Sequence, residues 1–371
     1  MGRSPSFHLL LLLAATTFFS LNPNPTYAQR GPQRLTATRL SEVDQDFAWQ
    51  GEFLGGIAGD RGCQTWGMQV VALGDGRFSA ALLHGGLPGR GAQESTRETL
   101  NGQRDGDQLV IRSDSLTFDL HPSEVRVFQR GRDGSGSGRF LGRMSRIHRG
   151  SPTMGLNPPS QAEVLFASSG QNAFSRSKVT EEGWLLSGVT TPSPVEDFIL
   201  HLEFQTPYMP YARGQARGNS GVYIQRRYEV QILDSFGQEA EASGCGGLYR
   251  QQAPDINMSY PPLTWQTYDI HFRAARFDDQ GEKISPAYLT VFHNGVAIHY
   301  QRVVPTKTGA GQPEGSQPLP IYLQDHGNPV MFRNVWIVNG TSGQAAPQPQ
   351  FVSTHPVRQV GPLRRWLFRC R

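Results

Sequence analysis

Apolar and polar residues alternate in short runs along most of this chain, and turns rich in glycine and proline separate the runs. Alternation with a period of two places the apolar side chains on one face of a β-strand, so each run predicts a strand. Between residues 46 and 149 the runs include MQVVAL and RFSAALL, which Gly74-Asp75-Gly76 joins as a hairpin turn. This stretch predicts a small all-β module.

A second series of strands is predicted between residues 162 and 340. Asn294-Gly295 suits the turn of a hairpin, and a later alternating run carries Gln324 and His326 on one polar face. No helical period separates these runs. Repeated short strands of this kind predict an all-β fold in which two packed sheets form a sandwich or jelly roll, preceded by the smaller all-β module.

The N-terminus has the pattern of a secretory signal peptide: Arg3, then LLLLLAA, then a small-residue cleavage site ending at Ala28. The apolar run is too short to anchor the chain across a bilayer, and no later window is apolar enough. We therefore expect an exported protein, periplasmic or extracellular, without a transmembrane anchor. Retention of an uncleaved signal stays open as an alternative.

Proline-rich and low-complexity stretches divide the rest of the chain. Pro152, Pro158 and Pro159 indicate a linker, and the C-terminal end is rich in proline and glutamine and then basic, which is typical of a disordered tail. The predicted organisation is a signal peptide at residues 1–28, the β-rich module at 46–149, the linker at 150–161, the jelly-roll domain at 162–340 and the tail at 341–371.

Composition agrees with a turn-rich β protein, because the 371 residues include 42 Gly and 26 Pro. The formal net charge of +4 becomes +3 when Arg3 leaves with the signal peptide, which does not indicate nucleic acid as a partner. Cys63, Cys245 and Cys370 allow at most one intramolecular disulfide. Their spacing with histidine matches no zinc motif.

The candidate chemistry lies in the segment GNSGVYIQRRYEVQILDSFG, residues 218–237. Glu229 and Gln231 share one face of the predicted strand, while Asp234 has the opposite parity. A β-bulge near Leu233 would bring Asp234 back to the same face. Two carboxylates flanking an amide then suit acid–base chemistry or a cation held against a sugar hydroxyl, although a solvated strand face explains the same pattern.

Five motifs in order resemble one family: residues 218–237, then CGGLYRQQAP, PPLTWQTYDIHFRAARFD, HNGVAIH and PIYLQDHGNPVMFRNVWI. Together they resemble the 3-keto-disaccharide hydrolase domain, described as 3-keto-alpha-glucoside-1,2-lyase and 3-keto-2-hydroxy-glucal hydratase and formerly a domain of unknown function. The resemblance covers residues 164–338 and implies a concanavalin A-like jelly roll of the lectin and glucanase type. The first module is similar to a β-rich segment that precedes this domain in some exported bacterial proteins.

The resemblance implies cleavage of 3-keto-glucosides by β-elimination, followed by hydration of the 3-keto-2-hydroxy-glucal. Such a site needs a base, a group that stabilises the enolate oxygen and a donor for the leaving oxygen. Glu229 or His326 would supply the base, with Asp234 as the third catalytic candidate. The same three residues would hold a divalent metal ion if the reaction uses one as a Lewis acid.

Further residues are candidates for substrate binding, and each also has a structural explanation such as a sheet ion pair, a turn or packing. Two rim positions, Tyr223 and Arg217, are weaker candidates. A second wall of the groove is expected from residues 324–333. The substrate-binding candidates are Gln231, Gln324, Arg333, Asn219 and Trp265.

The leading hypothesis is thus an exported enzyme that depends on a separate sugar oxidoreductase to make its 3-keto-glucoside. One alternative is a non-catalytic carbohydrate-binding or cell-surface module with a jelly-roll groove. Another is a direct glycosidase with two carboxylates, which Gln231 and the short Asp234 make less suitable.

Overall fold

The structure is a computed structural model that describes residue 2 and residues 35–60, 62–130 and 138–340. The predicted signal peptide at residues 1–28 and the tail at 341–371 lie outside these described residues, except for residue 2. Helices in the described part are single 3-10 turns: η1 (Leu40–Glu42), η2 (Gln45–Ala48), η3 (Glu94–Thr96) and η4 (Gly214–Ala216). None of the described helices is long and apolar enough to cross a membrane.

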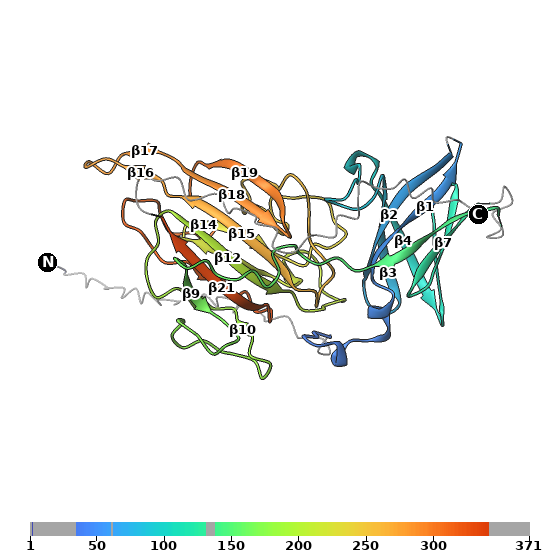
Figure 1. Cartoon of the computed structure of the whole chain (residues 1–371), viewed down its shortest axis with the longest axis horizontal. Helices are drawn as coiled ribbons and strands as arrows, with labels where there is room; N and C mark the ends of the chain where they lie inside the picture. The colour runs from blue at the N-terminus through green and yellow to red at the C-terminus, as the bar shows by residue number, and fades with distance from the viewer. Residues whose placement is uncertain (1, 3–34, 61, 131–137, 341–371) are drawn as a thin grey trace. The chain divides into compact units, whose positions relative to one another are not determined.

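Eight antiparallel strands form a closed barrel in which β8 pairs with β1 (Figure 1). The predicted hairpin at Gly74-Asp75-Gly76 is confirmed, and all three residues have positive φ. Phe53, Phe78 and other apolar side chains fill the interior, as expected for eight strands. The strands are β1 (Gly51–Gly59), β2 (Gly62–Ala72), β3 (Arg77–His84), β4 (Glu98–Asp105), β5 (Gln108–Arg112), β6 (Leu116–Leu120), β7 (Glu124–Gln129) and β8 (Phe140–Ile147).

The remaining strands form two packed sheets and one short hairpin. The larger sheet has the order β10-β21-β12-β15-β18-β19, with β9 paired to β21, and the smaller sheet has the order β11-β20-β13-β14. The prediction of an all-β fold with a jelly-roll sandwich is confirmed. The strands are β9 (Glu163–Phe166), β10 (Leu185–Leu186), β11 (Val189–Thr190), β12 (Phe198–Gln205), β13 (Ser220–Ile224), β14 (Tyr228–Ile232), β15 (Gln266–Arg273), β16 (Arg276–Phe277), β17 (Lys283–Ser285), β18 (Ala287–His293), β19 (Val296–Val304), β20 (Tyr322–Leu323) and β21 (Met331–Asn339).

The core of the sandwich lies between the two sheets. Leu200 of β12, Ile270 of β15 and Val291 of β18 face it from the larger sheet, and Val222 of β13 and Val230 of β14 face it from the smaller one. Because side chains alternate along a strand, the neighbours of these residues lie on the outer faces of the sheets. This alternation decides where the polar side chains described below are placed.

The predicted linker at residues 150–161 begins with a packed segment. Thr153 is buried, and its hydroxyl donates to Asp269 Oδ2 on β15 at 2.8 Å. The Ser151 hydroxyl lies 2.6 Å from the Thr267 hydroxyl, and the Gly155 amide donates to Glu203 Oε1 at 2.6 Å. The described residues between Leu35 and Gly340 belong to one compact unit, so the predicted domain boundaries stay a prediction.

Candidate active site

The hairpin of β13 and β14 places Glu229 and Gln231 on the outer face of the smaller sheet. The register is unbroken: Tyr223 lies opposite Glu229, and Gly221 lies opposite Gln231. Val230, between the two polar residues, points into the core. Loops cover the outer face, so Glu229 is only 2% exposed.

Distant segments enclose the Glu229 carboxylate. The Tyr249 amide donates to the Glu229 carbonyl at 3.1 Å, and the Glu229 amide donates to the Thr308 hydroxyl at 2.7 Å. A Cβ added at Gly309 would lie 3.9 Å from Glu229 Oε2, and one added at Gly221 would lie 2.4 Å from Oε1. The absence of a side chain at Gly221 therefore leaves room for the carboxylate, whereas a Cβ at Gly309 would only be in ordinary contact with it.

The amide of Gln231 completes one side of the carboxylate. With its amide turned so that both of its polar atoms find partners, Gln231 Nε2 donates to Ser220 O at 2.7 Å and to Glu229 Oε1 at 3.1 Å. In the opposite orientation of the amide, Gln231 Nε2 instead donates to Gln215 Oε1 at 2.9 Å. Gln231 thus lies between Glu229 and Gln215 of η4.

Burial changes the protonation of Glu229. It raises the pKa of the carboxyl group to about 7, and the interaction with the Tyr223 hydroxyl offsets part of this rise. Burial also raises the pKa of Tyr223, so its phenol stays protonated and remains a donor. A carboxyl group with a pKa near neutrality is suited to take up and release a proton.

Several buried polar atoms around the β13–β14 hairpin have no hydrogen-bond partner in the described part of the chain. A buried polar atom without a partner costs free energy, so a polar ligand or water is expected to satisfy it. Arg217 Nη2 is a donor, and the other four atoms are oxygens that accept hydrogen bonds. Glu229 Oε2 accepts when the carboxyl group is ionised. The five atoms are Arg217 Nη2, Asn219 Oδ1, Glu229 Oε2, Asp234 Oδ1 and Gln324 Oε1.

Asn219 and Gln324 lie next to the strand that faces Glu229. Asn219 Nδ2 donates to the Gln215 carbonyl at 2.7 Å. The backbone N–H of Gln324 donates to the Gly221 carbonyl at 2.8 Å, and the backbone carbonyl of Gln324 accepts from the Ser220 hydroxyl at 2.7 Å. The structure therefore brings these two predicted binding residues to the β13 side of the site.

Asp234 lies beyond the end of β14 and forms a buried ion pair with Arg217, with Oδ2 2.7 Å from Nε. The bulge expected near Leu233 is not part of the ladder, whose register runs without a shift to Ile232. Ile232 and Leu233 are consecutive core residues, so the strand alternation simply ends there. Since three strand residues already span about 10 Å, Asp234 is at the far end of the hairpin from Glu229.

His326 lies in an exposed turn after β20. The strand expected to carry it ends at Leu323, because the next residues turn and the Gly327 amide donates to Asp325 Oδ1 at 2.8 Å. Among the described residues no hydrogen bond orients the His326 ring. Of the two candidates for the base, Glu229 is therefore the one that the structure buries and orients.

Arg333 and Trp265 belong to a different surface from Glu229. Arg333 Nε lies 2.6 Å from Glu203 Oε2, and its guanidinium stacks 4.1 Å from the Trp265 ring centre. Glu203 lies on the outer face of the larger sheet, because its neighbours on β12 point into the core. The predicted second wall of the groove is thus corrected: Gln324 belongs to it, and Arg333 does not.

Glu203 is the centre of a charged cluster on that outer face. Burial by itself would raise the pKa of its carboxyl group, but hydrogen bonds from His201, Asn334 and Arg333 outweigh burial and lower the pKa to about 2. His201 also lies 2.6 Å from Asp269. The members of this cluster satisfy one another, which indicates a structural role.

The three predicted metal ligands do not form one ligand set. Asp234 is paired with Arg217, Glu229 is enclosed by tyrosines and glycines, and His326 is exposed. In the part of the chain that the structure describes, no group of three or more His, Cys, Asp or Glu side chains is arranged to hold a metal ion. The residues present therefore do not fit the predicted metal site.

Four residues that enclose the site were missed by the sequence reasoning. Gln215 is the nearest in sequence to the β13–β14 hairpin, yet its surroundings show no strand or motif signal. Tyr249, Thr308 and Gly309 come from loops about 20 and 80 residues after Glu229. Only the fold brings these loops against β14.

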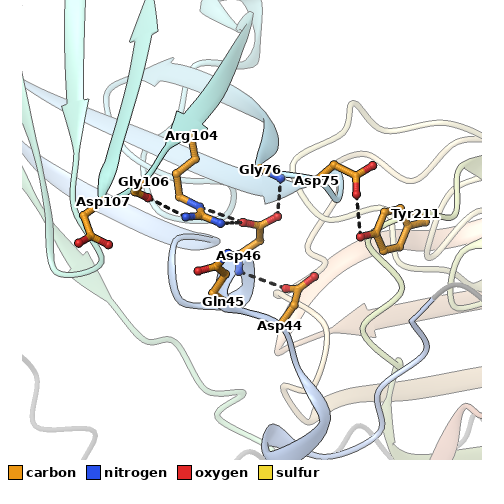
Figure 2. A pocket seen from close by; sticks show the side chains of 9 residues that line it. All are labelled: Asp44, Gln45, Asp46, Asp75, Gly76, Arg104, Gly106, Asp107 and Tyr211. Atoms are coloured by element: carbon orange, nitrogen blue, oxygen red, sulfur yellow. Dashed lines mark hydrogen bonds and ion pairs between the residues drawn. The ribbon is translucent and has the colours of Figure 1, made fainter.

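A separate polar cavity of about 540 Å³ lies beside the barrel turns (Figure 2). Asp46 Oδ1 accepts from Arg104 Nε at 2.9 Å, and the Tyr211 hydroxyl donates to Asp75 Oδ1 at 3.0 Å. Within residues 35–60, 62–130 and 138–340, none of its lining side chains leaves a buried polar atom without a partner, so it is a weaker candidate than the Glu229 site. It is lined by Asp44, Gln45, Asp46, Asp75, Gly76, Arg104, Gly106, Asp107 and Tyr211.

A jelly-roll sandwich that encloses a carboxylate and several unsatisfied polar atoms has the features of a carbohydrate-active protein, because sugar hydroxyls pair with such atoms. Residues 168–338 match the 3-keto-alpha-glucoside-1,2-lyase-like domain. These residues form a domain of this family, which supports a carbohydrate-active function of the glycosyl hydrolase type.

Two crystal structures, each of a candidate glycosyl hydrolase from Parabacteroides distasonis, are similar to this chain. The first is 30% identical and covers 49% of this chain and 85% of its own, with a TM-score of 0.44. The second is 16% identical and covers 50% and 99%, with a TM-score of 0.35. The fold class is assigned from the strand order and not from these two structures. No curated protein matches the chain.

Proposed function

We propose that this protein cleaves 3-keto-glucosides by β-elimination and then hydrates the product, with Glu229 as the base. The observation that carries the proposal is the buried Glu229 carboxyl group, whose pKa is raised to about 7 and whose Oε2 has no hydrogen-bond partner among the described residues. A base with this pKa is half ionised near neutral pH and is effective in proton abstraction.

The reaction follows from the ketone at carbon 3 of the sugar. The ketone acidifies the proton on carbon 2, because the carbanion left behind is delocalised as an enolate. Glu229 takes this proton, the enolate collapses to restore the ketone and form the carbon 1–carbon 2 double bond, and the glycosidic oxygen leaves with the bonding electrons and is protonated. Water then adds to carbon 1 and a proton returns to carbon 2, so the sum is hydrolysis.

Neighbouring side chains match the other requirements of this reaction. Tyr223, which lies opposite Glu229 across the hairpin, keeps its proton, and its hydroxyl would donate to an oxygen atom of the bound sugar in place of Glu229. Gln231 orients the carboxylate through its contact with Oε1. Asn219 and Gln324 each offer a buried acceptor for sugar hydroxyls.

A chromogenic 3-keto-glucoside and its unoxidised counterpart test the proposal. We expect aglycone release only from the keto sugar, a transient 2-hydroxy-glucal in the NMR spectrum, and deuterium at carbon 2 of the product when the reaction runs in D₂O. Glu229→Gln should lower kcat at least 100-fold, in keeping with the loss of a general base. Glu241→Gln is the matched control, since this side chain is exposed.

Equal cleavage of both glucosides would instead indicate a direct glycosidase, and no cleavage of either would overturn the proposal. The second candidate function is a non-catalytic carbohydrate-binding module. It is favoured if calorimetry shows tight binding of unoxidised polysaccharide that Glu229→Gln leaves unchanged. The raised pKa of Glu229 favours the enzyme, because a module that only binds sugar has no need of a titrating base.

The proposal includes the setting of the reaction. The signal-peptide pattern in residues 1–28 supports export to the periplasm or the extracellular space. A 3-keto-glucoside arises by oxidation of a glucoside, so a separate sugar oxidoreductase has to supply the substrate. Detection of the mature protein outside the cytoplasm, starting near Gln29, tests the first point.

A further inference from the structure

The two segments that flank the β13–β14 hairpin both contact the barrel. The first segment, residues 207–219, leads into β13, and the second, residues 233–238, follows β14. Arg217 at the end of the first segment and Asp234 in the second form the buried ion pair that closes this end of the hairpin. The Asp234 amide also donates to the Arg217 carbonyl at 3.1 Å.

The barrel holds the first segment through the end of β2 and the turn after it. Arg217 Nη1 donates to the Ala72 carbonyl at 3.2 Å, and Arg213 Nη2 donates to the Leu73 carbonyl at 2.8 Å. The Tyr211 hydroxyl donates to Asp75 at 3.0 Å (Figure 2). Because the pairing of barrel strands holds their backbone in place, the Ala72 carbonyl orients the Arg217 guanidinium.

The barrel holds the second segment at Gly237. Arg97 Nη1, which comes from the residue before β4, donates to the Gly237 carbonyl at 3.0 Å. A Cβ added at Gly237 would lie 2.6 Å from Val71 Cγ2, so the backbone of the segment packs directly on β2. The segment after β14 is thereby held against the same barrel strand as Arg217.

The barrel is also attached to the sandwich through Arg149, which follows β8. Arg149 pairs with Glu52 of β1 through Nη2 at 2.5 Å and Nε at 2.7 Å, and its guanidinium stacks 4.9 Å from the ring centre of Tyr260. The packed segment around Thr153 follows directly. The barrel is therefore joined to the sandwich by contacts other than those made by residues 207–219 and 233–238.

We propose that the barrel is a positioning module for the candidate active site: it fixes Arg217, and through Arg217 it fixes Asp234, at the end of the β13–β14 hairpin. Each of these two residues keeps one buried polar atom without a partner in the part of the chain that the structure describes, Arg217 Nη2 and Asp234 Oδ1. A donor and an acceptor on two side chains that pair with each other match a single sugar hydroxyl, which both accepts and donates. Loss of the barrel contacts should then misplace this pair without touching Glu229.

The test uses the full-length protein with Arg97→Ala and Tyr211→Phe combined, and Arg126→Ala as the matched control. Arg126 forms an exposed ion pair within the barrel, far in sequence from the contacts described here. Hydrogen exchange followed by mass spectrometry should show about tenfold faster exchange in residues 207–219 and 233–238 of the double variant only. The kcat/KM for the keto-glucoside should fall roughly 10- to 100-fold. In a third variant, Arg97→Lys in place of Arg97→Ala should recover most of both effects.

Unchanged exchange in the two segments would overturn the inference, and so would faster exchange with unaltered kcat/KM. Equal effects in Arg126→Ala would show that only barrel stability matters and would also overturn it. The activity arm rests on the proposed function, while the exchange arm does not. If the wild-type protein fails to cleave the keto-glucoside, the proposed function is lost and hydrogen exchange alone decides whether the barrel holds these segments.

Discussion

Gly221→Ala offers a sharp test of how closely the sheet fits the Glu229 carboxylate. An added Cβ would lie 2.4 Å from Oε1, whereas ordinary contacts begin at 3.4 Å, so the oxygen has to move by about 1 Å. Gly221 has no positive φ, so the alanine backbone is unstrained and the effect comes from this contact alone. A shift of this size at a reacting group costs roughly 100-fold in rate, and overpacking costs about 1–3 kcal/mol of stability.

The assay is kcat/KM for a 3-keto-glucoside together with thermal unfolding of the same preparations. Gly150→Ala is the control, since a Cβ there meets no atom within 4 Å and its φ is not positive. In a Glu229→Gln background, Gly221→Ala should add little further loss of activity. A folded Gly221→Ala protein with wild-type kcat/KM would refute the placement of the carboxylate over Gly221.

Three further outcomes are expected. Because the pKa of Glu229 is about 7, kcat/KM should fall about tenfold per pH unit below pH 7. Tyr223→Phe removes an interaction that lowers the pKa of Glu229, so the decrease in kcat/KM should begin at a higher pH in this variant. The pKa of Glu203 is about 2 in the folded protein and 4.5 as a free group, so its contribution to stability is present above pH 4.5 and is lost as the pH falls toward 2. In urea titrations, Glu203→Gln should make the free energy of unfolding depend less on pH between pH 4.5 and 2. An unchanged pH dependence would contradict the lowered pKa. Thr153→Val removes the donor to Asp269 and should cost about 1–3 kcal/mol in chemical denaturation, whereas no change would mean that water replaces it.

The unsatisfied polar atoms also say something about the ligand. Four of the five atoms around the hairpin are acceptors when Glu229 is ionised, and the fifth is the Arg217 donor. A ligand rich in hydroxyl groups satisfies such a set, because each hydroxyl donates one hydrogen bond. This agrees with a neutral sugar better than with an anion, which offers only acceptors.

The strand pattern predicted much of the fold because alternation is a local property. The turns at Gly74-Asp75-Gly76 and Asn294-Gly295 form where the sequence places them, and all five residues have positive φ. Closure of β1 to β8 into a barrel was not predictable from the same pattern. It depends on the pairing of β1 with β8, about 90 residues apart, which alternation along each single strand does not specify.

For the site, the sequence by itself determined that Glu229 and Gln231 share one face of a strand, because strand geometry sets the parity of neighbouring side chains. Only the tertiary structure decided the rest. It buried Glu229 under loops from residues about 20 and 80 positions away, which raises its pKa, and it paired Asp234 with Arg217 against the barrel. It also placed Arg333 on the other sheet, since the polarity of a side chain shows that it lies off the core but not which outer face it occupies.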